Sequence, residues 1–463
     1  MHIYLSKSKN MIHALCRITI FAFWMVFCSF LIMDYIPRYD ILAILVLIVS
    51  VVEVANMLME ESVYNSGLLM IFFLYTLVVH NGFVVSYIFD KSYATFQSVG
   101  SMAFLGMETF PKAIVIANTV ILTFVLSAMF SKSPFYYKKE AIEDRSNVFE
   151  GKKAADIVGI AFLSFGTLFL AYIVFTNRLW FIGYLNVLKI TRNIPLYLHV
   201  IVFTSLAIAF LMAAGTKKGV RIGVVIYLIT VLLHFAIGNR GEVLYSAVVC
   251  FALYSIRFRK IKTRHIVIAA AAMIVLIPLV RIARELALNS YTLNPISAFL
   301  DVLCEEGLEI SPFTHIVNYV EKGNPHVWGM TYVNDFWDFI ARRIGVNNTL
   351  AQTPYVITQI MPHSGMGFSM IAELYYNFTV VGACVVYILY AQLIKNLDKK
   401  SFCGELSDNK RLLYSMMMVE MINLTRNDAS TLPVYLTYSL ILVIIYKVVG
   451  SVAFSKSNRR GVV

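Results

Sequence analysis

The segment Gly238–Glu242 places an arginine and a glutamate two residues apart, between the apolar runs 222–237 and 243–256. Packing explains these charges poorly, because a charged side chain at membrane depth costs about 2.5–3.5 kcal/mol on insertion scales. Charge kept at that depth marks a functional site by default. Arg240 and Glu242 are therefore candidates for chemistry, and an internal ion pair that stabilises the turn is the alternative.

Three more arginines lie near the ends of apolar runs. Arg281 and Arg284 are three residues apart, a spacing that places both on one face of a helix. Arg426 lies in a Thr-Arg-Asn-Asp turn between two late apolar segments. A guanidinium is planar, permanently charged and suited to bidentate binding of phosphate, so a cluster of arginines predicts an anionic ligand such as a diphosphate. Local explanations stay open, because Arg281 could snorkel to the interface. Arg284 could pair with the glutamate that follows it, and Arg426 with Asp428.

Three residues are candidates for a base that accepts a proton from a hydroxyl group. His363 stands just before an apolar run, and a histidine at a cavity rim can act as a base near neutral pH. Glu373 falls about two turns inside that run, where an acidic residue should face protein or a watery cavity. Glu242 is the third. Glu305–Glu306 is interpreted instead as a solvated helix face.

The sequence predicts neither a metal site nor a cofactor. It contains no Asp-x-Asp, no P-loop, no Gly-x-Gly-x-x-Gly and no His-Glu-x-x-His. Its cysteines show no metal-ligand spacing. A metal-dependent sugar-nucleotide transferase would need carboxylates for Mg²⁺. The pattern therefore favours a site in which arginines alone neutralise a leaving diphosphate.

The elements that must position these residues are membrane helices. Of 463 residues, 59% are hydrophobic and 14% are charged, whereas a soluble domain has about 25% charged residues. Apolar stretches near 20 residues recur along the chain, which predicts an all-α polytopic membrane protein. A β-barrel is excluded because the runs are continuous and do not alternate. The twelve predicted spans are 14–33, 40–58, 66–87, 111–130, 155–175, 197–215, 221–237, 242–256, 265–281, 366–391, 412–424 and 432–450.

Basic loops predict the orientation of these spans. Lysines and arginines cluster after spans four, six, eight, ten and twelve and before span one. Because cytoplasmic loops carry an excess of Lys and Arg, both termini are predicted to be cytoplasmic. The candidate arginines and the long connection 282–365 then face the exterior. The net charge of +12 is thus an orientation signal rather than a sign of nucleic-acid binding.

The connection 282–365 is predicted to be a large, partly helical external loop. Pro295 can start one amphipathic helix, Gly323–Pro325 breaks the chain, and Tyr332–Ile344 gives a second amphipathic stretch. Such helices can lie in the membrane interface and cover a cavity, and a mere ordered spacer is the alternative. The predicted divisions are helices one to nine in 1–281, the loop in 282–365 and helices ten to twelve in 366–463.

This layout resembles that of the bacterial O-antigen and polysaccharide polymerases of the Wzy type. The local motifs are Gly238–Glu242 before an apolar helix, Gly367–Phe378 leading to Gly382, and Thr425–Asp428 in a late turn. The resemblance covers most of the chain. It implies a GT-C-like membrane glycosyltransferase of the bacterial inner membrane.

The resemblance also implies the chemistry. A growing glycan on undecaprenyl diphosphate would be the donor, and a hydroxyl of one lipid-linked repeat unit would attack its anomeric carbon as the lipid diphosphate leaves. The residues expected to bind the diphosphate are Arg240, Arg281, Arg284 and Arg426. The residues expected to supply a base are His363, Glu242 and Glu373. A chain-length regulator protein is a further candidate partner.

Two other functions compete with polymerisation. An O-antigen ligase would share the lipid-linked donor and differ in its acceptor. A lipid-linked oligosaccharide flippase or other transporter should carry ionisable residues at mid-depth in many helices and show two similar halves. No internal repeat is visible here, and the ionisable residues gather at one predicted face.

Overall fold

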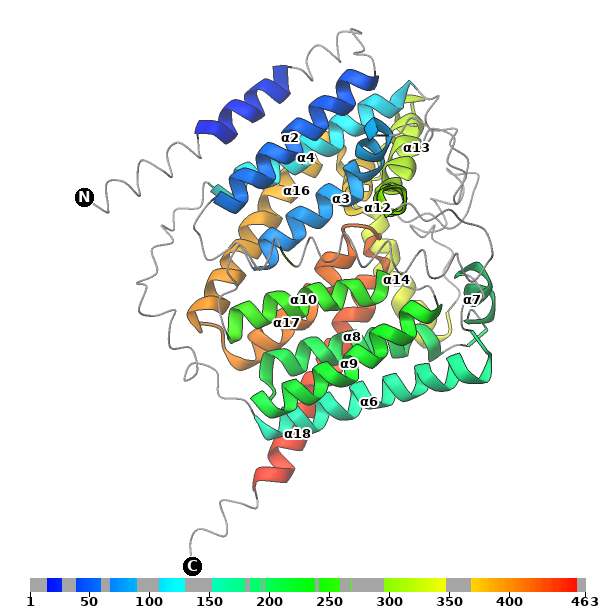
Figure 1. The fold of residues 1–463 in the computed structure, drawn as a ribbon, viewed down its shortest axis with the longest axis vertical. Coiled ribbons are helices and arrows are strands. Elements are labelled where there is room, and N and C mark those ends of the chain that lie inside the picture. The colour runs from blue at the N-terminus through cyan, green and yellow to red at the C-terminus, as the bar shows by residue number, and fades with distance from the viewer. Residues whose placement is uncertain are drawn as a thin grey trace, which may run out of the picture.

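A computed structural model describes residues 15–26, 39–59, 67–89, 108–129, 152–179, 184–191, 193–194, 196–237, 241–258, 268, 295–346 and 368–455. Within these residues every regular element is a helix (Figure 1). The elements are α2 (Tyr39–Met59), α3 (Leu68–Phe89), α4 (Thr109–Met129), α6 (Lys153–Thr176), α7 (Tyr184–Thr191), α8 (Leu196–Ala214), α9 (Lys217–Ile237), α10 (Gly241–Arg257), α12 (Pro295–Glu306), η4 (Gly307–Glu309), α13 (Ile310–Glu321), α14 (Met330–Ile344), α16 (Met370–Cys403), α17 (Asp408–Asn423), η5 (Ala429–Thr431) and α18 (Leu432–Ser455).

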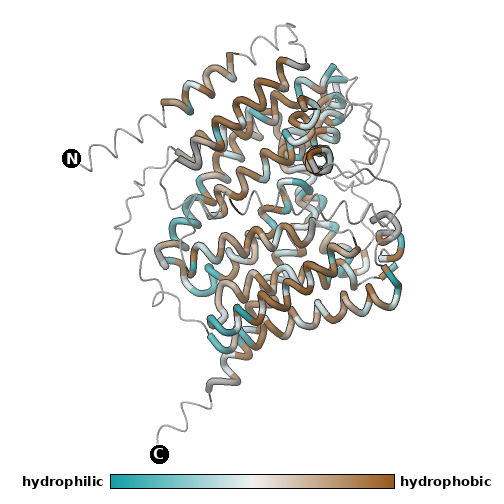
Figure 2. Tube along the Cα trace, viewed as in Figure 1, coloured by the Kyte–Doolittle hydropathy of each residue, from teal (hydrophilic) through white to brown (hydrophobic). Residues whose placement is uncertain are grey.

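The helices confirm an all-α polytopic membrane protein. In the described part of the chain, seven helices are long and apolar enough to cross a membrane: α3, α4, α6, α8, α9, α16 and α18. Three shorter apolar helices, Leu15–Val26, Ile41–Ala55 and Val243–Arg257, coincide with further predicted spans. Apolar residues dominate the bundle in Figure 2. The predicted span 265–281 lies outside the described residues, apart from Ile268.

The predicted span 412–424 corresponds to α17, which is helical but more polar than the others. Its last turns contain Glu420 and Asn423, both buried. The Thr431 hydroxyl donates to the Glu420 carboxylate at 2.7 Å, and the Asn423 amide donates to the same carboxylate at 2.9 Å. Because α17 packs against α8, α10 and α18, its polar side chains form hydrogen bonds with other protein groups. The helix therefore does not need a uniformly apolar surface.

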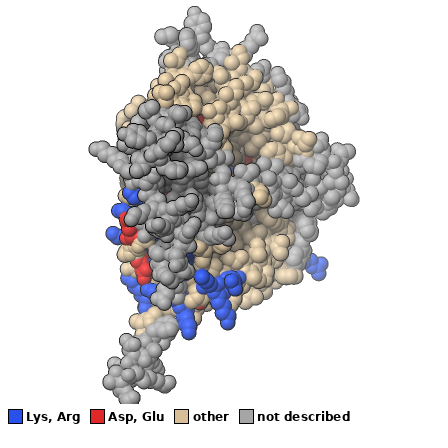
Figure 3. All heavy atoms as spheres, turned by 60° about the vertical axis from the view of Figure 1, so that its left-hand side comes forward, with Lys and Arg blue, Asp and Glu red and all other residues tan. Residues whose placement is uncertain are grey.

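Polar contacts between helix termini define two ends of the bundle. At the basic end, the Leu69 amide at the start of α3 donates to Asp398 late in α16 at 3.0 Å. Lys152, just before α6, pairs with Asp408 at the start of α17 at 2.6 Å. The exposed lysines of this end include Lys217, Lys218, Lys400 and Lys410. Figure 3 shows lysines and arginines gathered on the lower part of this side of the molecule.

The opposite end, here named the loop end, carries α7, α12, α13 and α14, which lie together at the right of Figure 1. Ser86, near the end of α3, donates to the Leu300 carbonyl of α12 at 2.8 Å. Lys112, near the start of α4, pairs with Glu321 at the end of α13 at 3.0 Å. The segment 295–346 is therefore fixed to the ends of the membrane helices.

The predicted loop contains helices where the sequence indicated them, but one of these helices, α13, is not peripheral. α12 begins at Pro295, and the break predicted at Gly323 follows α13, where Gly323 has a φ of 90°. The turn η4 separates α12 from α13, which the sequence pattern did not distinguish. Ile310, Phe313 and Ile316 of α13 are fully buried, so α13 belongs to the core of the bundle. α14 differs, since it keeps apolar residues such as Val333 and Trp337 exposed.

A contact between two glycines sets the position of η4 against α3. A Cβ atom on Gly82 would lie 2.3 Å from the Leu303 carbonyl oxygen, and one on Gly307 would lie 1.9 Å from the Phe83 nitrogen. Real Cβ atoms do not approach so closely, so both positions need the absence of a side chain. The backbones of α3 and η4 therefore touch directly.

α16 is kinked about two turns after its first residue, Met370. Phe378 and Thr379 have non-helical backbone angles, with a φ of 67° at Thr379. The amides of Val327 and Trp328 donate to the carbonyls of Tyr376 and Asn377 at 3.3 and 3.0 Å. In a regular helix these carbonyls would accept from residues four positions later. The amides of residues 327 and 328 therefore replace hydrogen bonds that the kink in α16 removes.

Candidate functional site

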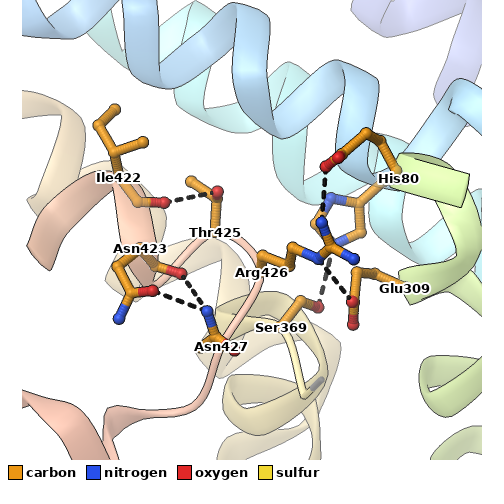
Figure 4. Close-up of polar contacts among 9 residues, drawn as sticks. His80, Glu309, Ser369, Ile422, Asn423, Thr425, Arg426 and Asn427 are labelled. Atoms are coloured by element: carbon orange, nitrogen blue, oxygen red, sulfur yellow. Dashed lines mark hydrogen bonds and ion pairs between the residues drawn. The ribbon is translucent and has the colours of Figure 1, made fainter. Parts of the chain in front are cut away.

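The turn after α17 presents Arg426 at the loop end. The Arg426 and Asn427 amides both donate to the Asn423 carbonyl at 3.0 Å. The Asn427 side chain donates to the Asn423 side-chain oxygen at 2.7 Å, and the Thr425 hydroxyl donates to the Ile422 carbonyl at 2.7 Å (Figure 4). These local bonds fix the backbone on both sides of the arginine, so its side chain projects from a rigid turn.

The guanidinium of Arg426 lies between two carboxylates of the segment 295–346. Its Nη1 is 2.7 Å from Glu306 Oε2, and its Nε is 3.2 Å from Glu309 Oε1. The side chains are 27% exposed for Arg426, 14% for Glu306 and 6% for Glu309. Among the described residues, no hydrogen bond to Nη2 is formed.

Two local predictions about this region were wrong. Asp428 is not the partner of Arg426, because its carboxylate accepts from the Ser430 amide at 3.0 Å and caps η5. Glu306 does not belong to a solvated helix face, since it is largely buried and ion-paired with Arg426. The true partners lie more than 100 residues earlier in the chain, and a local pattern cannot reveal such a pairing.

Charge and burial oppose each other in this cluster. The Glu306 carboxylate, more than any other group, raises the pKa of Arg426 above its already high value. Burial raises the pKa of Glu309 to about 7, and the positive charge of Arg426 acts in the opposite direction. Glu309 therefore carries a carboxyl group that can exchange a proton near neutral pH.

The first turn of α10 contributes to the same cluster. Tyr245 and Tyr75 both interact electrostatically with Arg426, and their rings meet edge to face with centroids 5.8 Å apart. Tyr245 stands four residues after Gly241, the first residue of α10, a rise of about 6 Å. The helix that follows the Gly-Asn-Arg-Gly-Glu motif thus begins close to Arg426.

Glu373 is fully buried and joins two other segments. One carboxylate oxygen accepts from the Thr331 hydroxyl of α14 at 2.8 Å, and the other accepts from the Ala429 amide of η5 at 2.9 Å. Asn377, one turn later, donates to the same Thr331 hydroxyl at 2.7 Å. Both oxygens of Glu373 are thus engaged by protein groups, an arrangement suited to holding the Arg426 turn against α14.

His80 is a further buried polar residue of the loop end, and the sequence interpretation did not select it. Its Nδ1 is 2.9 Å from the Thr76 carbonyl, and its Nε2 is 3.0 Å from the Ser369 hydroxyl. Ser369 is the N-cap of α16 and accepts from the Ala372 amide at 3.4 Å. The signal in the sequence was the polar pair His80-Asn81 inside an apolar span.

Of the seven site residues predicted from the sequence, the structure describes the surroundings of Arg426 and Glu373. These two lie at the same end, on segments joined through Ala429 and its neighbours. Glu242 lies in the first turn of α10, but its side chain is outside the described part of the structure. Arg240, Arg281, Arg284 and His363 lie outside the described residues. Among the described residues, no three His, Cys, Asp or Glu side chains form a group that could hold a metal ion.

Comparison with known proteins gives two matches. A family model described as O-antigen polysaccharide polymerase Wzy matches residues 16–458. Protein CapE of Staphylococcus aureus is 27% identical over 380 residues, which cover 80% of this chain and 82% of that protein. No solved structure matches the chain.

Proposed function

Because the chain belongs to the O-antigen polysaccharide polymerase Wzy family, we propose that it polymerises undecaprenyl-diphosphate-linked repeat units at the outer face of the cytoplasmic membrane. A hydroxyl of the acceptor repeat unit attacks the anomeric carbon of the donor glycan. The bond from that carbon to the diphosphate breaks, and the lipid diphosphate leaves. The reaction needs charge stabilisation for the leaving group, a proton acceptor and aligned substrates.

The observation that supports this proposal best is the placement of Arg426. It comes from a rigid turn at the loop end and is held in place by Glu306, and none of the described residues forms a hydrogen bond to its Nη2. A preorganised, permanently charged donor of this kind stabilises charge that develops on a leaving diphosphate. In this proposal arginines do the work that carboxylate-bound Mg²⁺ does in other transferases, which agrees with the lack of any Asp-x-Asp in the sequence.

The other predicted arginines extend the proposed site. Arg240 directly precedes α10, whose first turn lies beside Arg426 through Tyr245. We assign Arg240, with Arg281 and Arg284, to the same diphosphate. His363 and Glu242 remain proposed bases. We reassign Glu373 from base to positioning residue, because both of its oxygens already accept hydrogen bonds.

The test is substitution of Arg426 in cells that depend on this protein for their surface polymer. Arg426→Ala should lower the polymerisation rate by about 10²–10³-fold, the usual cost of removing one preorganised donor. Single repeat units should then reach the surface without polymer. Arg426→Lys should also fail, since an ammonium group does not reproduce the fork of a guanidinium.

The matched control is Arg342→Ala on α14. Arg342 also lies at the loop end, but it is 65% exposed and paired with Asp338 of its own helix at 2.7 Å. This variant should keep wild-type chain lengths. Wild-type polymer in the Arg426→Ala strain would refute the proposed role of the arginine. A complete loss of surface repeat units would point to transport instead of polymerisation.

A further inference from the structure

Glu309 has a buried carboxylate oxygen that the described structure leaves unused. Oε1 accepts from Arg426 Nε at 3.2 Å, whereas Oε2 is buried and makes no hydrogen bond within the described residues. Buried polar atoms are nearly always hydrogen-bonded, and an exception in a native protein needs an explanation. A carboxylate that served only to hold Arg426 would have no use for an unpaired second oxygen.

Holding Arg426 does not require Glu309 to stay ionised. Glu306 binds the guanidinium through Nη1 at 2.7 Å, the shorter of the two ion pairs. The side chain of Glu306 is 14% exposed and that of Glu309 is 6% exposed. Glu309 can gain or lose a proton while Glu306 still holds the arginine in place.

The backbone of Glu309 is fixed by the contact between η4 and α3. Glu309 ends η4, and η4 touches α3 through the close approach of Gly307 to Gly82 and Phe83. Ile310, the next residue, is fully buried. The carboxyl group is therefore held by packed elements, as a group that must act at a defined position requires.

The charged groups around Glu309 suit proton transfer near neutral pH. Burial raises the pKa of Glu309 to about 7, Arg426 works against this rise, and Glu306 adds to it. Tyr75 of α3 and Tyr245 of α10 also interact electrostatically with Arg426. A base is most effective when its pKa lies near the working pH.

Building on the proposed polymerase function, we propose that Glu309, in place of His363 or Glu242, is the general base that takes the proton of the acceptor sugar hydroxyl. The hydroxyl O–H bond breaks and its proton passes to Oε2. The hydroxyl oxygen bonds to the donor anomeric carbon, and the bond from that carbon to the diphosphate breaks with its electron pair on the diphosphate. Glu309 returns the proton to water once the lipid diphosphate has left.

Arg426 and Glu309 then serve the two halves of one reaction. In this proposal the guanidinium of Arg426 faces the leaving diphosphate, while the adjacent Glu309 faces the acceptor. Since Oε2 is closed off in this structure, the acceptor hydroxyl reaches it only after the cluster opens to admit both substrates. Catalytic hydrogen bonds commonly form only in the substrate complex.

The experiment uses purified full-length protein, lipid-linked repeat units from a polymerase-deficient strain, and the Glu309→Gln variant. Glutamine keeps the shape of the side chain and cannot accept the proton. The variant should polymerise about 10²–10⁴-fold more slowly, and the rise of the wild-type rate with pH through about 7 should disappear. Binding of farnesyl diphosphate, measured by calorimetry at pH 7, should be retained. Glu321→Gln is the matched control, because Glu321 lies on the same segment, 295–346, and its carboxylate is exposed and pairs with the exposed Lys112.

Each outcome decides the matter. A Glu309→Gln rate within about threefold of wild type would overturn the proposal, and so would a slow variant that keeps the wild-type pH profile. A variant that also loses farnesyl diphosphate binding would show that Glu309 only supports Arg426. Wild-type protein that forms no polymer from the lipid-linked units would instead refute the proposed function, and the inference would fall with it.

Discussion

At the scale of single residues, the charge of the Arg426 cluster depends on one proton. With Glu306 and Glu309 both ionised the three side chains sum to about −1, and with Glu309 protonated they sum to about zero. A diphosphate approaching the guanidinium of Arg426 therefore meets less repulsion when Glu309 carries a proton. Because burial raises the pKa of Glu309 to about 7, this change falls within the physiological range of pH.

Diphosphate binding should consequently tighten as pH falls through 7. Glu309 is mostly ionised at pH 8 and mostly protonated at pH 6, so the Kd for farnesyl diphosphate should be larger at pH 8. The expected change is on the order of tenfold. Two unit charges about 6–8 Å apart interact by about 1–2 kcal/mol when the effective dielectric constant lies between the values for protein and for water. Titration calorimetry at several pH values measures it. The Glu309→Gln variant is the control, because any change of its Kd with pH comes from titration of the ligand itself. An equal change of Kd with pH in the wild-type protein and in the variant would contradict the prediction.

Glu373 should behave as a positioning residue. Glutamine at this position can accept one hydrogen bond, but its amide group cannot accept from both Thr331 and Ala429. Glu373→Gln should destabilise the junction by about 1–3 kcal/mol and slow polymerisation, yet the pH profile of the remaining activity should keep its wild-type shape. Thr331→Val removes two bonds, the one to Glu373 and the one from Asn377, and should lower Tm by a comparable amount. A pH profile that flattens in Glu373→Gln would restore Glu373 as a base.

At the scale of elements, the site depends on how the segment 295–346 meets α3. The start of α12 at Pro295 and the break at Gly323 could be predicted, because proline and glycine act on their own backbone. The contact of Gly82 with Gly307 could not, since a glycine within an apolar helix does not specify its neighbour across 225 positions. The same limit applies to Arg426, whose turn was recognised from the sequence and whose partners were not.

Adding a single methyl group at Gly307 should therefore impair the site, although Gly307 itself is not one of the site residues. The new Cβ would lie 1.9 Å from the Phe83 nitrogen, so η4 must move away from α3 and carry Glu309 with it. Gly307→Ala should reduce polymerisation at least about tenfold while membrane insertion and protein level stay near normal, because displaced reacting groups lose rate steeply. Gly450→Ala is the control, since its Cβ would make only an ordinary 3.9 Å contact with Ala154. Equal activity of the two variants would show that the α3–η4 contact does not position the site.

At the scale of the whole molecule, the helices separate two chemically different ends. The exposed lysines that follow the predicted even-numbered spans, such as Lys218 and Lys410, lie at the basic end, and the Arg426 cluster lies at the other. Hydropathy predicted most spans, because a membrane helix must satisfy its backbone internally and is apolar over about 20 residues. It described α17 less well, because a helix enclosed by other helices can carry Glu420 and Asn423.

The positive-inside bias predicts that the basic end is cytoplasmic and that the Arg426 cluster faces outward. Two exposed lysines make a matched pair for a test: Lys322 after α13 at the loop end, and Lys218 in the first turn of α9 at the basic end. In a background with all cysteines replaced by serine, the Lys322→Cys variant should react with a membrane-impermeant maleimide in right-side-out vesicles. The Lys218→Cys variant should react only in inside-out vesicles. The reverse pattern would place the Arg426 cluster in the cytoplasm, where a polymerase acting on exported repeat units could not use it.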